Sequence, residues 1–208
     1  MVSESGGRGQ RRIFFQATEN PVEIIDKTIG TPGDSQITYE NRESGQVYGI
    51  EFETRKSLDF ISRHFRGLTL GVNASYIQSE TELTPVELNN NPYAEQTRPL
   101  YDQSPYIVNV DLNYEHPTSG TSLTLGANFT GERIVLATSL GEDIYEHPPV
   151  SLDAAISQKF WKNWTIRFGV KNLLDPLYVR TFGAGRDGNV FQSYHRGRTY
   201  SLTLTGEF

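Results

Sequence analysis

The chain has 208 residues, with 19 Lys and Arg against 25 Asp and Glu and a formal net charge of −6. This acidic balance argues against a nucleic-acid-binding protein, which would carry a basic patch. Cysteine is absent, which excludes disulfides, thiolate metal sites and cysteine nucleophiles. Hydrophobic residues make up only 36% of the chain, which is low for a globular core but suits a barrel with one apolar face and a wet interior.

The N-terminal residues differ in character from the rest of the chain. Residues 1–11 are rich in Gly and Arg and lack the apolar stretch of a signal peptide. We expect residues 1–11 to be a disordered linker or an artefact of the start, and residues 12–208 to be the C-terminal piece of a longer protein. Residues 13–29 are a first candidate strand, although Pro21 interrupts them.

Seven further segments alternate between apolar and polar residues. In residues 68–78, for example, Leu70 and Val72 alternate with Gly71 and Asn73. Because side chains in a strand point to alternate sides, each segment has one apolar and one polar face. Most segments have the roughly 9–11 residues that a tilted strand needs to cross a bilayer. The seven are residues 47–56, 68–78, 106–114, 123–130, 150–157, 164–171 and 200–208.

The connections between these segments alternate in length. The short ones are residues 57–64, 115–121 and 161–163, and the long ones are residues 30–36, 79–103, 132–149 and 173–193. Long structureless loops are unusual in compact soluble domains, whereas a membrane barrel has short periplasmic turns and long outer loops. The predicted fold is therefore all-β: an antiparallel, up-and-down transmembrane β-barrel segment of about eight strands.

The last strand ends on an aromatic residue. Tyr200, Leu202, Leu204 and Phe208 share one face, and the other face is polar. This pattern resembles the closing strand of bacterial outer-membrane barrels, in which a C-terminal Phe is part of the signal read by the assembly machinery. We expect these four residues to form that signal.

No catalytic or metal-binding pattern stands out. The four histidines, His64, His116, His147 and His195, lie far apart without metal-ligand spacing, and neither a nucleophile elbow nor a P-loop occurs. We therefore expect no enzymatic activity, metal site or cofactor. Glu51 and Glu53 share a polar face, where partners such as Arg55, Arg167 or Lys171 are expected on adjacent strands.

One long connection is the best candidate for contacting a ligand. Its tip, residues 183–189, is rich in Gly and carries Arg186 and Asp187, while Tyr194 and His195 follow. Binding residues concentrate on loops held by a rigid scaffold. The alternative is that Arg186 and Asp187 only pair with each other in solvent, which contributes under about 1 kcal/mol.

Four phrases add a family resemblance to the periodicity. They are YGIEFE at 48–53, RPLYDQSPYIVN at 98–109, VKNLLDPLY at 170–178 and GRTYSLTL at 197–204. In this order they resemble late barrel strands of TonB-dependent outer-membrane receptors. The resemblance implies the C-terminal part of a 22-stranded barrel, with a plug domain and a TonB box upstream.

The resemblance also implies a function. Such a receptor lies in the outer membrane of a Gram-negative bacterium and performs energised uptake of a scarce ligand such as a siderophore, cobalamin or glycan. Its partners would be outer-membrane lipid, the barrel assembly machinery, the plug domain, TonB and a small extracellular ligand, and this segment alone is not expected to transport. Two alternatives are a complete eight-stranded outer-membrane barrel for adhesion or structure, and a soluble lipocalin-like barrel with its apolar face inward.

Overall fold

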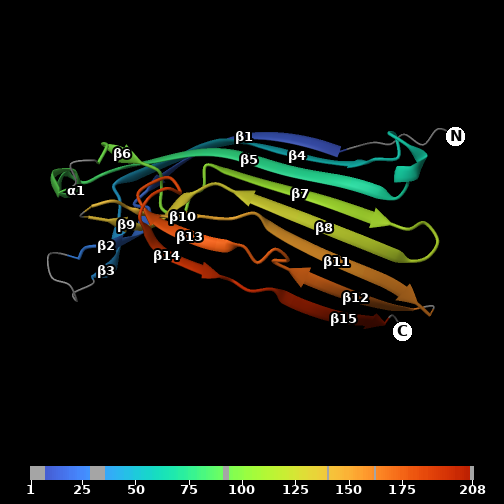
Figure 1. The fold of residues 1–208 in the computed structure, drawn as a ribbon. Helices are drawn as coiled ribbons and strands as arrows, with labels where there is room; N and C mark the ends of the chain where they lie inside the picture. Colours follow the sequence, from blue (N-terminus) through green and yellow to red (C-terminus); the bar gives the residue numbers. More distant parts are fainter. Residues whose placement is uncertain (1–7, 29–35, 91–93, 140, 162, 207–208) are drawn as a thin grey trace.

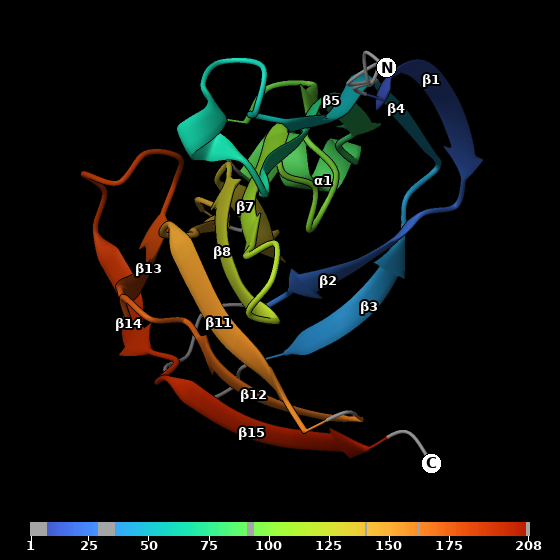
Figure 2. The same ribbon diagram turned by 90° about the vertical axis from the view of Figure 1, so that its right-hand side faces the viewer.

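The structure, a computed structural model, describes residues 8–28, 36–90, 94–139, 141–161 and 163–206. Its largest feature is a sheet, here called the wall, whose strands run side by side in Figure 1 and form a curved sheet in Figure 2. Eight strands follow in the order β1 (Arg8–Glu19), β4 (Ser44–Ser57), β5 (Leu68–Glu82), β7 (Tyr106–Glu115), β8 (Thr121–Thr130), β11 (Ser151–Phe160), β12 (Trp164–Lys171) and β15 (Thr199–Gly206).

Every neighbouring pair in the wall is antiparallel. This confirms the predicted all-β, up-and-down arrangement and its eight strands. Within the described residues β1 and β15 are opposite edges of the sheet and do not pair with each other. The wall is therefore open, which gives no support to a complete eight-stranded barrel.

The register of the wall gathers the apolar side chains on one face. Leu112 lies opposite both Leu70 and Leu125, and Ala154 lies opposite Leu125 and Val170. Large side chains of this face are exposed, by 46% at Leu125 and 72% at Leu202. A lipocalin-like barrel would bury these residues in its core, so the exposed apolar face contradicts that alternative.

The opposite face of the wall carries polar contacts between strands. The Nδ2 atom of Asn128 donates to Oδ1 of Asn109 at 2.8 Å, and Arg55 lies 3.8 Å from Asp111. A Cβ atom at Gly71 would lie 2.2 Å from Oδ1 of Asp111, so the missing side chain of Gly71 makes room for this carboxylate.

The partner of Glu51 differs from the expectation. Glu51 pairs with Arg12 of β1 at 3.6 Å, rather than with Arg55, Arg167 or Lys171, because β1 begins early enough to lie beside it. Residues 8–11 of the expected linker are thus strand, and residues 1–7 lie outside the described residues.

The sequence predicted that the long connections are structureless loops, but in the structure residues 79–103, 132–149 and 173–193 contain strands. Six short strands that lie between strands of the wall form a second sheet in the order β14 (Val190–His195), β13 (Leu177–Phe182), β10 (Ile144–His147), β9 (Arg133–Thr138), β2 (Val22–Asp26) and β3 (Ile37–Asn41). Its members lie together at one end of the wall in Figure 1. The connection after β5 holds helix α1 (Pro85–Asn90) and strand β6 (Thr97–Arg98), which pairs with β5. Within the described ranges no helix has the length and apolar character needed to span a bilayer.

The prediction of one strand over residues 13–29 was wrong. Asn20 has φ of 53°, a left-handed conformation that Asn tolerates better than most residues, and Pro21 has no N–H for a ladder. The carbonyl of Pro21 instead accepts from the backbone N–H of Arg42 at 2.8 Å. The chain therefore turns out of the wall after β1 and enters the second sheet as β2.

The segment from 170 to 178 leaves the wall through a turn built on two short polar residues. Asn172 and Asp175 have positive φ angles of 55° and 45°. Asn172 Nδ2 donates to the carbonyl of Gly197 at 2.8 Å, and the N–H of Gly197 donates to Oδ1 of Asp175 at 2.9 Å. These side chains close the junction where β12 leaves the wall, as short polar residues do at turns.

The two faces of β7 give a matched test of this fold. Val110→Arg places a guanidinium on the apolar face, where a charge facing hydrocarbon costs about 2–4 kcal/mol, so membrane insertion should fall sharply. Asn109→Arg, one residue away on the polar face, should insert normally. Insertion is measured by heat-modifiable gel mobility of a receptor that contains this chain, after it folds into lipid vesicles, with Leu70→Arg and Asn73→Arg as a second pair. Equal insertion of both members of each pair would contradict the face assignment.

Candidate functional site

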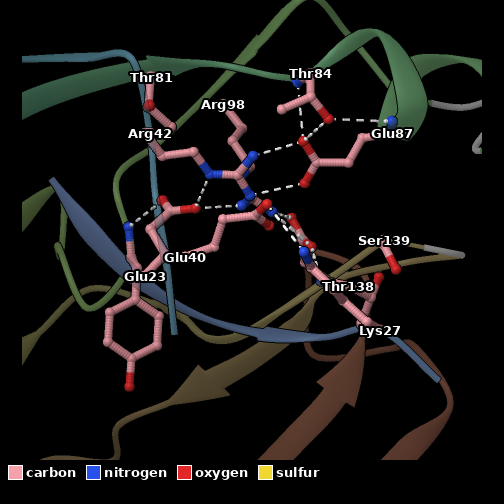
Figure 3. Close-up of polar contacts among 12 residues, drawn as sticks. Glu23, Lys27, Glu40, Arg42, Thr81, Thr84, Glu87, Arg98, Thr138 and Ser139 are labelled. Atoms are coloured by element: carbon pink, nitrogen blue, oxygen red, sulfur yellow. Dashed lines mark hydrogen bonds and ion pairs between the residues drawn. The ribbon is translucent and has the colours of Figure 1, made fainter. Parts of the chain in front are cut away.

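A line of alternating charges is buried where the second sheet meets the wall (Figure 3). Arg42 contacts Glu87 and Glu23, each at 2.5 Å, and Arg98 contacts Glu23 at 2.6 Å and Asp143 at 2.8 Å. We call these five residues the junction network. They come from the connections that follow β1, β5 and β8, so the network fastens these three connections to one another.

Burial makes the charges of the junction network strongly interdependent. The side chains of Arg42 and Glu23 are each 1% exposed. Burial alone would raise the pKa of Glu87, but hydrogen bonds from Arg42 and Thr84 outweigh it and lower that pKa to about 2. Burial would also lower the pKa of Arg42, but its two carboxylate partners raise it. Removing one member would leave a buried charge without its partner, which costs about 3–5 kcal/mol.

The first turn of α1 positions Glu87. The backbone N–H of Glu87 donates to Oγ1 of Thr84 at 3.3 Å, and the N–H of Thr84 donates to Oε2 of Glu87 at 2.9 Å. This reciprocal pair is a capping box, and Pro85 occupies the first helical position, where its missing N–H costs least. Residues 84–87, TPVE, are the sequence signal that could have located this element, which the sequence analysis missed.

A second charge cluster surrounds Glu146 in β10. Cross-strand pairing places Glu146 opposite Arg133 of β9 and Arg180 of β13. The Glu146 carboxylate accepts from Arg133 and Arg180 and from the hydroxyl of Tyr194, all at 3.0–3.1 Å, and Arg196 lies 3.9 Å away. We call Arg133, Glu146, Arg180, Tyr194 and Arg196 the Glu146 cluster.

Tyr145 lines two cavities of about 390 Å³ each. Glu87, Arg98 and Asp143 of the junction network line the first cavity, and Arg133 lines the second. Burial raises the pKa of the Tyr145 phenol to about 12, so Tyr145 is a neutral hydrogen-bonding group at neutral pH. Cavities lined by charged and phenolic side chains of this kind suit a small polar ligand.

Both ring nitrogens of His147 contact side chains of the protein. Its Nδ1 lies 3.1 Å from Oε2 of Glu132, and its Nε2 lies 2.7 Å from the hydroxyl of Thr181. Among the described residues no group of three or more His, Cys, Asp or Glu could hold a metal ion. The geometry around His147 is that of a structural contact.

The structure does not bring the four predicted ligand-contact residues together. Arg186 and Asp187 are exposed at the tip between β13 and β14, and within the described residues they form no ion pair with each other. Tyr194 turns toward Glu146, whereas Nδ1 of His195 lies 2.9 Å from the carbonyl of Asp175. Tyr194 and His195 are consecutive in β14 and therefore point to opposite faces.

Hydrogen bonds hold the tip, residues 183–189, in place, although its glycines alone would favour a flexible loop. The N–H of Gly183 donates to the carbonyl of Asp143 at 2.9 Å, and the N–H of Gly185 donates to Glu132 at 3.2 Å. Of the predicted assembly residues, Tyr200, Leu202 and Leu204 lie exposed in β15, and Phe208 lies outside the described residues.

The pKa of Glu87 yields a pH-dependent prediction. Because the pKa falls from 4.5 to about 2 on folding, ionised Glu87 stabilises the fold above pH 4.5, and this contribution disappears as the pH falls toward 2; its size is roughly 3 kcal/mol. Glu87→Gln should therefore lower the local free energy of opening at pH 7 by about that amount. The measurement is hydrogen exchange of residues 84–90, corrected for intrinsic rates, with the exposed Glu95→Gln as control. A difference from the unsubstituted protein that stays constant from pH 7 to pH 2 would contradict the assignment.

Comparison with known proteins identifies the family to which the chain is similar. Residues 14–173 match the family described as TonB dependent receptor-like, beta-barrel. Among solved structures the chain is similar to the ferric-catecholate import receptor Fiu of E. coli K12 in its closed form, with a TM-score of 0.60 and 15% identity. At this identity the likeness shows the fold alone. The comparison with curated proteins finds no match.

The structural match covers very different shares of this chain and of the Fiu chain. The structural match covers 100% of this chain and 26% of the Fiu chain, so the chain spans about a quarter of that receptor's length. The family match covers most of the wall, from β1 to the end of β12. The chain belongs to the TonB-dependent receptor-like β-barrel family.

Proposed function

We propose that this chain forms part of the barrel of an outer-membrane receptor in a Gram-negative bacterium, and that the receptor imports a scarce ligand with energy delivered through TonB. The observation that carries the proposal is the wall, whose exposed apolar face and polar inner contacts suit lipid on one side and water on the other. The matched family supports the same role.

The proposal assigns different partners to different parts of the molecule. Outer-membrane lipid contacts the apolar face, and the barrel assembly machinery reads the last strand, with Tyr200, Leu202, Leu204 and Phe208 as its signal. A plug domain and TonB act through the N-terminal part of a longer receptor, of which this chain supplies the late strands. The second sheet, built from the long connections, faces the outside and meets the ligand.

A siderophore is the ligand class with the most support. The structural relative is a ferric-catecholate import receptor, and cobalamin and glycans remain the competing classes. Arg186, Asp187, Tyr194 and His195 stay the proposed contact residues; Arg186 and Asp187 are accessible at the tip between β13 and β14.

Uptake by living cells tests the function. Cells that express the receptor under iron limitation should accumulate a labelled ferric siderophore, and accumulation should fall to background when TonB is deleted or the proton gradient is collapsed, because transport needs that energy. Labelled cobalamin and an oligosaccharide serve as parallel substrates. Correct outer-membrane assembly with no TonB-dependent uptake of any of the three classes would refute the proposed transport function.

Substitution at the tip tests ligand contact separately from assembly. The double variant Arg186→Ala, Asp187→Ala should weaken ligand binding about tenfold, which corresponds to about 1.4 kcal/mol, and should leave heat-modifiable mobility unchanged because both side chains are exposed. Arg63→Ala, in the short connection at the opposite end of the wall, is the matched control. Binding that is equal in both variants would remove the tip from the contact surface.

A further inference from the structure

The Glu146 cluster holds more positive than negative charge. Arg133, Arg180 and Arg196 all lie within 4.0 Å of the Glu146 carboxylate. Arg133 has a second acidic partner, Asp102, at 3.1 Å. Within the described residues Arg180 and Arg196 have no acidic partner other than Glu146, so two guanidiniums share one carboxylate.

Glu146 is already well supplied with hydrogen bonds. Its Oε2 accepts from Nε and Nη2 of Arg180 and from the hydroxyl of Tyr194, and its Oε1 accepts from Arg133. Arg196 stays 3.9 Å from Oε1, which is beyond hydrogen-bond distance. A guanidinium has five N–H donors, and Arg196 uses none of them on this carboxylate.

Aromatic rings hold both arginines in place without cancelling their charge. Tyr178 and Tyr194 stack at 5.4 Å with an angle of 15° between the rings. The guanidinium carbon of Arg196 lies 3.9 Å from the centre of the Tyr178 ring, and that of Arg180 lies 5.6 Å from the centre of the Tyr194 ring. The rings attract cations through their quadrupoles but carry no net charge, so the guanidiniums are fixed and the excess charge remains.

The exposure of the cluster favours an incoming anion. The Glu146 side chain is 2% exposed, whereas Arg180 is 30% and Arg196 is 50% exposed. A dissolved anion can therefore reach the guanidiniums, while the carboxylate that would repel it is covered. Side chains that are already fixed lose little freedom when they bind, which favours affinity.

We propose that Arg180 and Arg196 form a binding site for an oxyanion group, a carboxylate or a phosphate. The planar guanidinium fork matches both groups with paired hydrogen bonds. The site as an anion site stands on this geometry alone; that the oxyanion belongs to the imported ligand rests on the proposed function. The opposing interpretation is that Arg196 only packs its stem and guanidinium on Tyr178.

Arginine-selective labelling tests the site with inorganic phosphate as the probe. The protein, extracted from membranes in detergent, reacts with phenylglyoxal at constant ionic strength, and mass spectrometry follows each arginine. Phosphate should slow the labelling of Arg196 and Arg180 in a saturable way, by about elevenfold at ten times the dissociation constant for one site. The exposed Arg63 is the control and should react at an unchanged rate. No slowing at Arg196, or equal and unsaturable slowing at Arg63, would overturn the proposal.

Two substitutions separate anion binding from simple packing. Tyr178→Phe keeps the ring, so protection of Arg196 and Arg180 by phosphate should persist; Tyr178→Leu removes the ring, and the phosphate concentration for half-protection should rise about tenfold. The same half-protection concentration in both variants would contradict a ring-organised site. Labelling requires no transport, so a failed uptake experiment with intact phosphate protection would count against the transport function alone.

Discussion

The wall depends on one constraint: a strand that crosses hydrocarbon must pair its backbone on both sides and turn a single face to lipid. Seven antiparallel pairings satisfy the interior strands from β4 to β12. The outer edges of β1 and β15 keep unpaired backbone groups within the described chain, and such edges do not face lipid in known membrane barrels. The open edges therefore support the proposal that these strands belong to a larger barrel.

Buried ion pairs stabilise the second sheet. Its strands are short, with four residues in β10 and five in β2, and isolated short hairpins are marginal in water. Buried ion networks supply the missing specificity, because Arg42 and Arg98 each bind a carboxylate that lies 45 residues away along the chain. Burial strengthens these contacts and makes each one depend on the others.

This division explains what the sequence could predict. The wall strands alternate over eight or more residues, so Val110 and Asn109 reveal their faces without knowledge of their neighbours. A strand such as β10, Ile144–His147, is too short to show such a pattern. The partners of Glu146 lie on β9 and β13, and no local pattern contains that pairing. The same holds for Glu51, whose partner Arg12 became visible only with the register of β1.

The candidate contact residues Arg186, Asp187, Tyr194 and His195 came from one local segment, and the structure points their side chains to different places. The sequence favoured Arg186 and Asp187 because glycines suggested a free tip, whereas backbone bonds at Gly183 and Gly185 fix that tip. Tyr194 contacts a buried carboxylate, a stacked tyrosine and a guanidinium, and no local sequence pattern predicts these neighbours. Backbone pairing over eight or more residues orders each strand of the wall, whereas ion pairs between distant residues order the second sheet, so local sequence patterns predict the first and not the second.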